Sequence, residues 1–222
     1  MLKNILTQNK LNFSDVIDIR NKRLFKFDFS KENKELTPEI INSTNALAAY
    51  IDETLLKNDA EIGYGGYLED RAIYKKSVHF GGDDINSRTI HLGVDIWCKA
   101  GEPVFAPCDA VVHSFKNNNN FGDYGATIIL KHTIDNVDFY TLYGHLSLKS
   151  LENIKVNDVI KQSEKFAELG NESENGNWPP HLHFQIINDI EGKFGDYPGV
   201  CSFKEIDKYS ANCINPKYIL GI

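Results

Sequence analysis

Two histidines stand two residues apart, His181 and His183, in a segment with the composition of a β-strand. Side chains two residues apart on a strand point to the same face of the sheet. Both imidazoles would then share one face, and the opposite face would be apolar: Leu182, Phe184 and Ile186. Pro179 and Pro180 cannot donate to a neighbouring strand, so we expect this strand to begin just after them.

Two other segments offer side chains of matching chemistry. In the extended segment 91–95, His91 and Asp95 would share a face, and Gly93 would leave space between them. His145 follows a predicted strand, at a bend marked by Gly144. Histidine and aspartate suit a zinc ion with bonds of about 2.0–2.2 Å and a fourth position open for water. Histidines beyond the ligand set suit acid/base and oxyanion roles around that water.

The elements that must position these residues are mostly strands. Short apolar or alternating runs separated by turns are typical of antiparallel sheets packed as a sandwich or barrel. Five such runs are predicted in the second half of the chain, at 104–107, 110–115, 126–132, 137–143 and 166–169. Asp135-Asn136 predicts a tight hairpin between two of them.

Residues 1–75 have a different pattern. The alternation over 24–29 predicts a short half-buried strand. Thr37 and Pro38 suit the N-cap and first turn of a helix, and apolar residues then recur at near-helical spacing to about Lys57, which predicts one helix. Because the apolar stripe of this helix needs a partner, we expect an N-terminal extension over 1–75, docked on a catalytic domain over 76–222.

Composition excludes several classes of protein. The chain has 222 residues with a net charge of -7, which argues against binding to nucleic acid and to anionic membranes. Nothing in it approaches the roughly 18 apolar residues of a membrane span. Because the start does not resemble a secretory signal, we expect a cytoplasmic protein unless another route exports it. Four cysteines without C-x-x-C spacing are expected to be reduced: Cys98, Cys108, Cys201 and Cys213. The oligomeric state is not predicted.

Together these motifs resemble those of the lysostaphin-like zinc metallopeptidases, the peptidoglycan endopeptidase family that includes staphylococcal autolysins. The resemblance spans roughly residues 78–190 and rests on three motifs: His91-x-x-x-Asp95, Tyr143-Gly144-His145-Leu146-Ser147 and His181-Leu182-His183-Phe184. It implies a mainly β fold, with an antiparallel sandwich or barrel-like catalytic domain and the metal in a groove between loops. It also implies that His91, Asp95 and His183 bind a zinc ion (Zn2+), and that His145 and His181 are catalytic histidines that do not bind it.

The activity that this resemblance implies is a zinc-dependent endopeptidase, a hydrolase that cleaves peptide bonds in peptidoglycan cross-links or related short peptides through a zinc-activated water. Two alternatives stay open: a non-catalytic or regulatory module of the same fold, and a cytoplasmic peptidase or amidase with a substrate outside the cell wall. Degenerate members of the family lose one or more ligands, whereas this chain keeps all five residues, which favours catalysis. The other histidines are expected to be structural: His79, His113 and His132.

Overall fold

The computed structural model describes residues 1–9, 12–76 and 86–222. Its strands are β1 Leu24–Lys26, β2 Ile62–Gly65, β3 Arg88–His91, β4 Val94–Trp97, β5 Pro103–Phe105, β6 Ala110–Asn118, β7 Gly125–Ile134, β8 Val137–Leu146, β9 Val159–Ile160, β10 Lys165–Glu168, β11 His181–Ile187, β12 Val200–Ser202 and β13 Cys213–Ile214. Its helices are α1 Leu2–Gln8, α2 Pro38–Ile41, α3 Thr44–Lys57, α4 Ile206–Asn212 and α5 Lys217–Leu220, with short 3-10 turns at Ala72–Lys76, Leu148–Leu151 and Phe203–Glu205.

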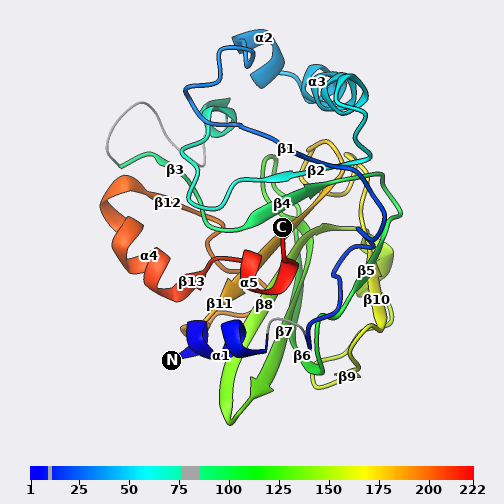
Figure 1. The fold of residues 1–222 in the computed structure, drawn as a ribbon, viewed down its shortest axis with the longest axis vertical. Coiled ribbons are helices and arrows are strands. Elements are labelled where there is room, and N and C mark those ends of the chain that lie inside the picture. Colours follow the sequence, from blue (N-terminus) through cyan, green and yellow to red (C-terminus); the bar gives the residue numbers. More distant parts are fainter. Residues whose placement is uncertain (10–11, 77–85) are drawn as a thin grey trace.

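One large sheet organises the molecule (Figure 1). Its strands lie in the order β1-β2-β4-β11-β8-β7-β6-β9, and β13 pairs with β11. All neighbouring strands are antiparallel except β1 and β2. Two smaller antiparallel pairs, β5–β10 and β3–β12, accompany this sheet. The expectation of a mainly β, antiparallel fold is therefore confirmed.

The long strands follow from the sequence pattern. Asp135 and Asn136 form the predicted two-residue hairpin between β7 and β8, and both have positive φ angles, 51° and 59°. This backbone twist matches the twist of paired strands, and Asp and Asn tolerate it better than most residues. Apolar side chains of β6, β7, β8 and β11 fill the main core, including Val112, Ile128, Phe139 and Phe184.

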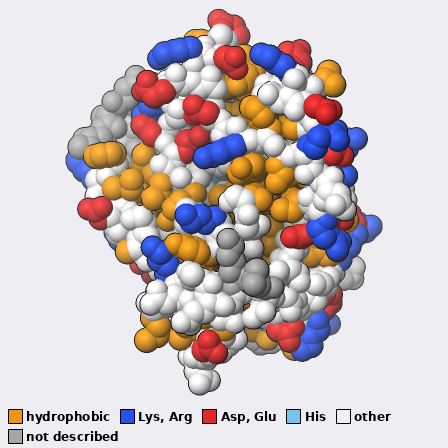
Figure 2. Space-filling view, in the orientation of Figure 1, with side chains coloured by type: hydrophobic (Ala, Val, Ile, Leu, Met, Phe, Trp, Pro, Cys, Tyr) orange, Lys and Arg blue, Asp and Glu red, His pale blue; other side chains and the backbone are white. Residues whose placement is uncertain are grey.

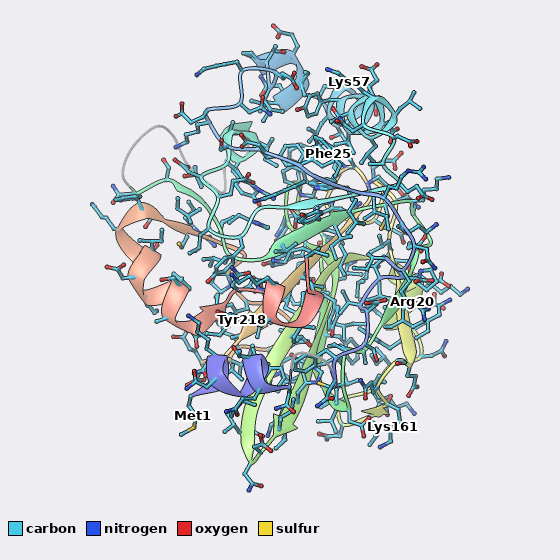
Figure 3. All side chains as sticks on the ribbon, in the orientation of Figure 1. Met1, Arg20, Phe25, Lys57, Lys161 and Tyr218 are labelled. Atoms are coloured by element: carbon cyan, nitrogen blue, oxygen red, sulfur yellow. The ribbon has the colours of Figure 1, made fainter. Side chains whose placement is uncertain are left out.

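Residues before 75 take part in this architecture at two places. β1 and β2 extend the sheet beyond β4, and α3 covers them with an aromatic cluster that includes Phe27, Phe29 and Trp97. Phe25, labelled in Figure 3, lies between the sheet and α3. On the other side of the molecule, α1 lies beside α5 (Figures 1 and 3), where Lys3 sits over the ring of Tyr218. The division at residue 75 stays a prediction, since strands before and after it share one sheet.

The prediction of a single helix in this region is wrong in detail. The segment 38–57 forms two helices, and α1 is a third. The break falls at Asn42-Ser43, where the hydroxyl of Ser43 accepts the backbone N–H of Ala46 at 3.2 Å. Serine and asparagine side chains compete for backbone hydrogen bonds in this way, so they favour a new cap over a continuous helix.

Several smaller expectations can be compared with the structure. All four cysteines carry free thiols, as expected. In the described part of the chain, no helix has the length and apolar character required to cross a bilayer. On the face drawn in Figure 2, basic and acidic side chains are interspersed. His79 lies outside the described residues.

Candidate active site

Antiparallel pairing brings the predicted site residues onto one face of the sheet. Asp95 on β4 lies opposite His183 on β11, and His183 lies opposite Gly144 on β8. Directly opposed residues on neighbouring strands have adjacent side chains on the same face. The aspartate and the histidine are 88 residues apart in the chain, so this contact is made by strand register alone.

His91 reaches the same point from a different sheet. The segment 91–95 is not one extended strand as expected: β3 ends at His91 and pairs with β12, whereas β4 begins at Val94 and joins the large sheet. The chain bends at Leu92-Gly93. A Cβ atom on Gly93 would lie 2.7 Å from Cε1 and Nε2 of His183, so the glycine gives room to the third side chain of the cluster.

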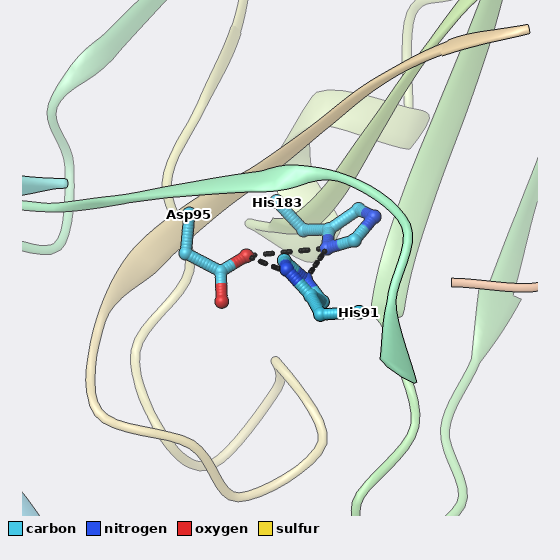
Figure 4. Close-up of side chains that lie close together, drawn as sticks. All are labelled: His91, Asp95 and His183. Atoms are coloured by element: carbon cyan, nitrogen blue, oxygen red, sulfur yellow. Dashed lines mark hydrogen bonds and ion pairs between the residues drawn. The ribbon is translucent and has the colours of Figure 1, made fainter. Parts of the chain in front are cut away.

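The three side chains converge at ligand-like distances (Figure 4). Nε2 of His91 lies 2.9 Å from Nδ1 of His183 and 3.3 Å from Oδ1 of Asp95, and that oxygen lies 3.1 Å from Nδ1 of His183. Ligand atoms around a tetrahedral zinc ion with bonds of 2.0–2.1 Å are about 3.3 Å apart. All three residues are buried. The donor set therefore fits a small divalent cation.

Hydrogen bonds at the far side of each imidazole fix which nitrogen faces the centre. Nδ1 of His91 donates to the carbonyl of Gly66 at 3.0 Å, and Nε2 of His183 donates to the side-chain oxygen of Gln185 at 3.1 Å. The inward nitrogens are then lone-pair acceptors beside a carboxylate. Burial, with a contribution from the nearby Arg71, lowers the pKa of His91 to about 3. A proton is thus a poor partner for the inward nitrogen of His91, and a metal ion is a suitable partner for the cluster.

His181 lies beside this centre, with its Nε2 directed toward Asp95. Its Nδ1 donates to the carbonyl of Pro179 at 2.7 Å, so Nε2 carries the lone pair, 3.9 Å from Oδ1 of Asp95. Burial lowers the pKa of His181 to about 4, which keeps the ring neutral near pH 7. The strand begins at His181, directly after the two prolines, as predicted.

His145 completes the group. Its Nδ1 donates to the carbonyl of Asn175 at 2.8 Å, and its ring centroid lies 4.1 Å from that of His181. Burial and the neighbouring His181 hold its pKa well below the usual range. Its backbone has a φ of 62°, unusual for a residue with a side chain. The expected bend after the strand is therefore an irregularity within β8, which continues to Leu146 and redirects the imidazole.

Two important residues were missed by the sequence analysis. Arg71 is fully buried and forms an ion pair with Asp95. Tyr124 is also buried, with its ring 5.0 Å from that of His183 and 5.8 Å from that of His145. Neither has a local motif: Arg71 lies in a charged run before the site, and Tyr124 lies in a polar loop. The one sequence signal is Gly125, which directly follows Tyr124.

A cleft of about 510 Å³ opens beside these side chains. Its walls include Tyr74, Trp97 and Trp178 together with Tyr124 and Tyr197. Trp178, just before the two prolines, has two roles in the structure: it lines the cleft, and its side chain, 4% exposed, packs in the cluster around α3. By contrast, His113 and His132 are not among the lining residues. The cleft is large enough for a short peptide.

Comparison with known proteins identifies a family domain within the chain. Residues 89–194 match the sequence model of Peptidase family M23, and all five site residues fall within this stretch: His91, Asp95, His145, His181 and His183. The chain thus contains a domain of this family, which confirms the resemblance found in the sequence. The L-Ala–D-Glu endopeptidase of Bacillus subtilis (strain 168) is 31% identical over 119 residues, covering 50% of this chain and 34% of the relative. The chain spans about a third of the length of that relative.

Part of the chain is also similar to solved structures of peptidases. The catalytic domain of the antimicrobial peptidase lysostaphin from Staphylococcus simulans is 26% identical, with a TM-score of 0.44 over 74% of this chain and 95% of that domain. A zinc-containing peptidase from Vibrio cholerae is 27% identical, with a TM-score of 0.36 over 44% of this chain and 27% of that one.

Proposed function

We propose that the chain is a zinc-dependent endopeptidase whose substrates are peptidoglycan cross-links or related short peptides. The observation that carries this proposal is the convergence of three buried ligand-type atoms, from His91, Asp95 and His183, beside two further histidines at a cleft. The printed name of the Bacillus subtilis relative, an L-Ala–D-Glu endopeptidase, supports a peptide substrate. Membership of a peptidase family supports hydrolysis as the reaction.

His91, Asp95 and His183 would hold the zinc ion. When bound, zinc polarises a scissile carbonyl and lowers the pKa of a water molecule toward ~7. His181 is placed to accept the proton of that water, because its Nε2 carries a lone pair 3.9 Å from the carboxylate oxygen of Asp95. After accepting the proton, the same nitrogen can donate it to the leaving amine.

His145 then acts on the substrate oxygen. In the neutral state its Nδ1 proton is committed to the carbonyl of Asn175, so Nε2 can donate only when the ring is protonated. Two rings whose centroids are 4.1 Å apart will not both be protonated, since like charges at that distance disfavour each other. Both rings are neutral at rest, so during the reaction the pair would hold at most one added proton, the one accepted from water, on the nitrogen that faces the developing negative charge.

The alternatives differ in what they require of the site. A non-catalytic module needs no complete ligand set, yet all three ligand-type side chains are present and buried at matching distances. A peptidase or amidase acting on a substrate outside the wall would use the same site. The cytoplasmic location expected from the sequence would favour that second alternative. Analysis of the cleavage products distinguishes a cell-wall substrate from another substrate, and a non-catalytic module would give no products.

The decisive experiment combines metal analysis with a search for products. Protein purified without added zinc should contain close to one zinc per chain, and incubation with purified peptidoglycan and with a peptide library should give new termini by mass spectrometry. The double variant Asp95→Ala, His183→Ala should lose both properties. A matched control, His113→Ala with Asp138→Ala, removes the same residue types outside the cleft and should keep both. Full zinc content in the first double variant would refute the ligand assignment.

A further inference from the structure

Arg71 brings the segment before the family-matched region into the centre of the site. It precedes residue 89, where the M23 match begins, and its side chain is fully buried. Its segment runs alongside β3: the backbone N–H of Arg71 donates to the carbonyl of Thr89, and the N–H of His91 donates to the carbonyl of Glu69, both at 2.9 Å. This backbone pairing sets the arginine next to the proposed ligands.

Every nitrogen of the guanidinium group already has an acceptor. Nε donates to Glu69 at 2.8 Å, Nη1 donates to Oδ2 of Asp95 and to the hydroxyl of Tyr74, and Nη2 donates to the carbonyl of Gly65 at 3.4 Å. The group also lies 5.6 Å from the ring centroid of Phe29. A planar guanidinium held at all three nitrogens has a fixed orientation. Four of its five N–H donors have these acceptors and the side chain is fully buried, which favours a positioning role for Arg71 over contact with a substrate.

The two oxygens of Asp95 consequently have different partners. Oδ2 accepts from Arg71, whereas Oδ1 faces His91 at 3.3 Å and His183 at 3.1 Å. A carboxylate can bind a metal through one oxygen or through both. The arginine occupies one oxygen and leaves the other for the ion. The carboxylate of Glu69 offsets the added positive charge near the centre.

We propose that Arg71 is a positioning residue for Asp95: it limits the carboxylate to one oxygen toward the metal and makes the N-terminal segment a necessary part of the metal site. The proposal rests on the zinc site proposed above. It assigns to residues outside the family-matched stretch a role in metal binding.

Gly66 gives a second, independent observation. Its carbonyl accepts Nδ1 of His91, so the same short segment holds two of the three ligand residues. A Cβ atom at Gly66 would lie 1.9 Å from Nη2 of Arg71 and 2.8 Å from Nδ1 of His91, and the glycine has a φ of 108°. Only a residue without a side chain allows the segment to pass this close. The close approach of segment 65–71 to the site is therefore part of the fold itself, and it depends on this glycine.

The test compares Arg71→Met, Arg71→Lys and a matched control, Arg23→Met, whose arginine is exposed and pairs with Asp59 in the same N-terminal region. Two quantities are measured: the zinc Kd, by competition with a chromophoric chelator, and the visible absorption of the cobalt(II)-substituted protein, which reports coordination geometry. We expect Arg71→Met to bind zinc about 10–100-fold more weakly. Its cobalt spectrum should change because the released oxygen of Asp95 can also bind. The control should match the parent protein in both measurements.

Each outcome decides between the possibilities. An unchanged Kd and an unchanged cobalt spectrum in Arg71→Met would refute the positioning role. If that variant does not fold, as judged by circular dichroism, Arg71→Lys decides, because it keeps the charge but cannot bridge Asp95 and Glu69. A lysine variant that matches the parent in both measurements would also refute the role. If the parent protein binds neither zinc nor cobalt, the proposed metal site itself is wrong, which separates that failure from the failure of this inference.

Discussion

Trp97 stacks on His181, with the two ring centroids 4.1 Å apart and the ring planes at 25°. The two residues are directly opposed on β4 and β11, two register steps from the opposed pair Asp95 and His183. One strand pair therefore carries both the proposed base and two proposed ligands. On its other side Trp97 packs against Phe29, with centroids 5.2 Å apart, so the stacking surface under the imidazole is itself fixed.

The first prediction separates metal binding from turnover. His145→Ala and His181→Ala should each keep zinc, because neither supplies a ligand atom to the cluster, yet lose about 10²–10⁴-fold in peptide-cleavage rate. His91→Ala should lose zinc and activity together. Paired metal analysis and cleavage kinetics on the three variants check this. If His181→Ala lost its zinc while His183→Ala kept it, the base and the ligand would have been assigned the wrong way round.

A second prediction concerns the bend between β3 and β4. Gly93→Ala should weaken zinc binding without changing any ligand, because the new methyl group would occupy space now filled by the ring of His183 and would also approach the carbonyl of Phe184. We expect a loss of about 10-fold or more, similar to that for disturbed ligand orientation. Gly192→Ala is the control: nothing lies within 4 Å of its Cβ position, it does not line the cleft, and the strain from its φ of 70° falls outside the site. Equal zinc affinities in both variants would show that the site tolerates displacement of His183.

A third prediction concerns the residues before 75, which we expect to unfold together with the catalytic domain. Phe29 is completely buried against Trp97, so Phe29→Ala should reduce the free energy of unfolding by about 3–5 kcal/mol. The exposed Leu56, changed to Ala, should have little effect. Limited proteolysis with thermal melting provides the wider test. Rapid release of a soluble fragment that starts near Tyr67 and melts like the whole protein would contradict docking.

A fourth prediction uses His132, which lies apart from the cleft. Its ring stacks on Phe139 at 4.9 Å, and burial lowers its pKa to about 4 from a usual value of 6.5. As the pH falls below about 6.5, the unfolded chain takes up a proton that the folded protein refuses until about pH 4. The free energy of unfolding should therefore decrease across this range, with His132 contributing up to about 3 kcal/mol.

Urea denaturation of the parent and of His132→Gln at several pH values measures that contribution. The variant should lose stability less steeply with decreasing pH, and the buried histidines of the site contribute equally to both proteins, so they cancel in the difference. His113→Gln is the control, since His113 is only partly buried. Parallel stability curves for parent and His132→Gln would mean that His132 has the same pKa in the folded and unfolded protein, which would contradict the prediction.

The sequence by itself singled out five candidate site residues and predicted most strands. His181 and His183 could be placed on one face because a strand alternates with a period of two residues, which is a property of the local backbone. The hairpin at Asp135-Asn136 was predictable for the same reason, since its backbone angles depend on those two residues. The separation into ligands and catalytic histidines came from the resemblance, and it stays a prediction.

Tertiary structure decided everything that depends on pairing between distant segments. The register of β4 and β11 sets Asp95 opposite His183, and no local pattern encodes which residues of two strands will be opposed. The apparently continuous segment 91–95 divides between two sheets, because β12 and the large sheet compete for its backbone hydrogen bonds. Arg71 became part of the site only through the backbone pairing of its segment with β3, since its own neighbours give no sign that a charged side chain will be buried there.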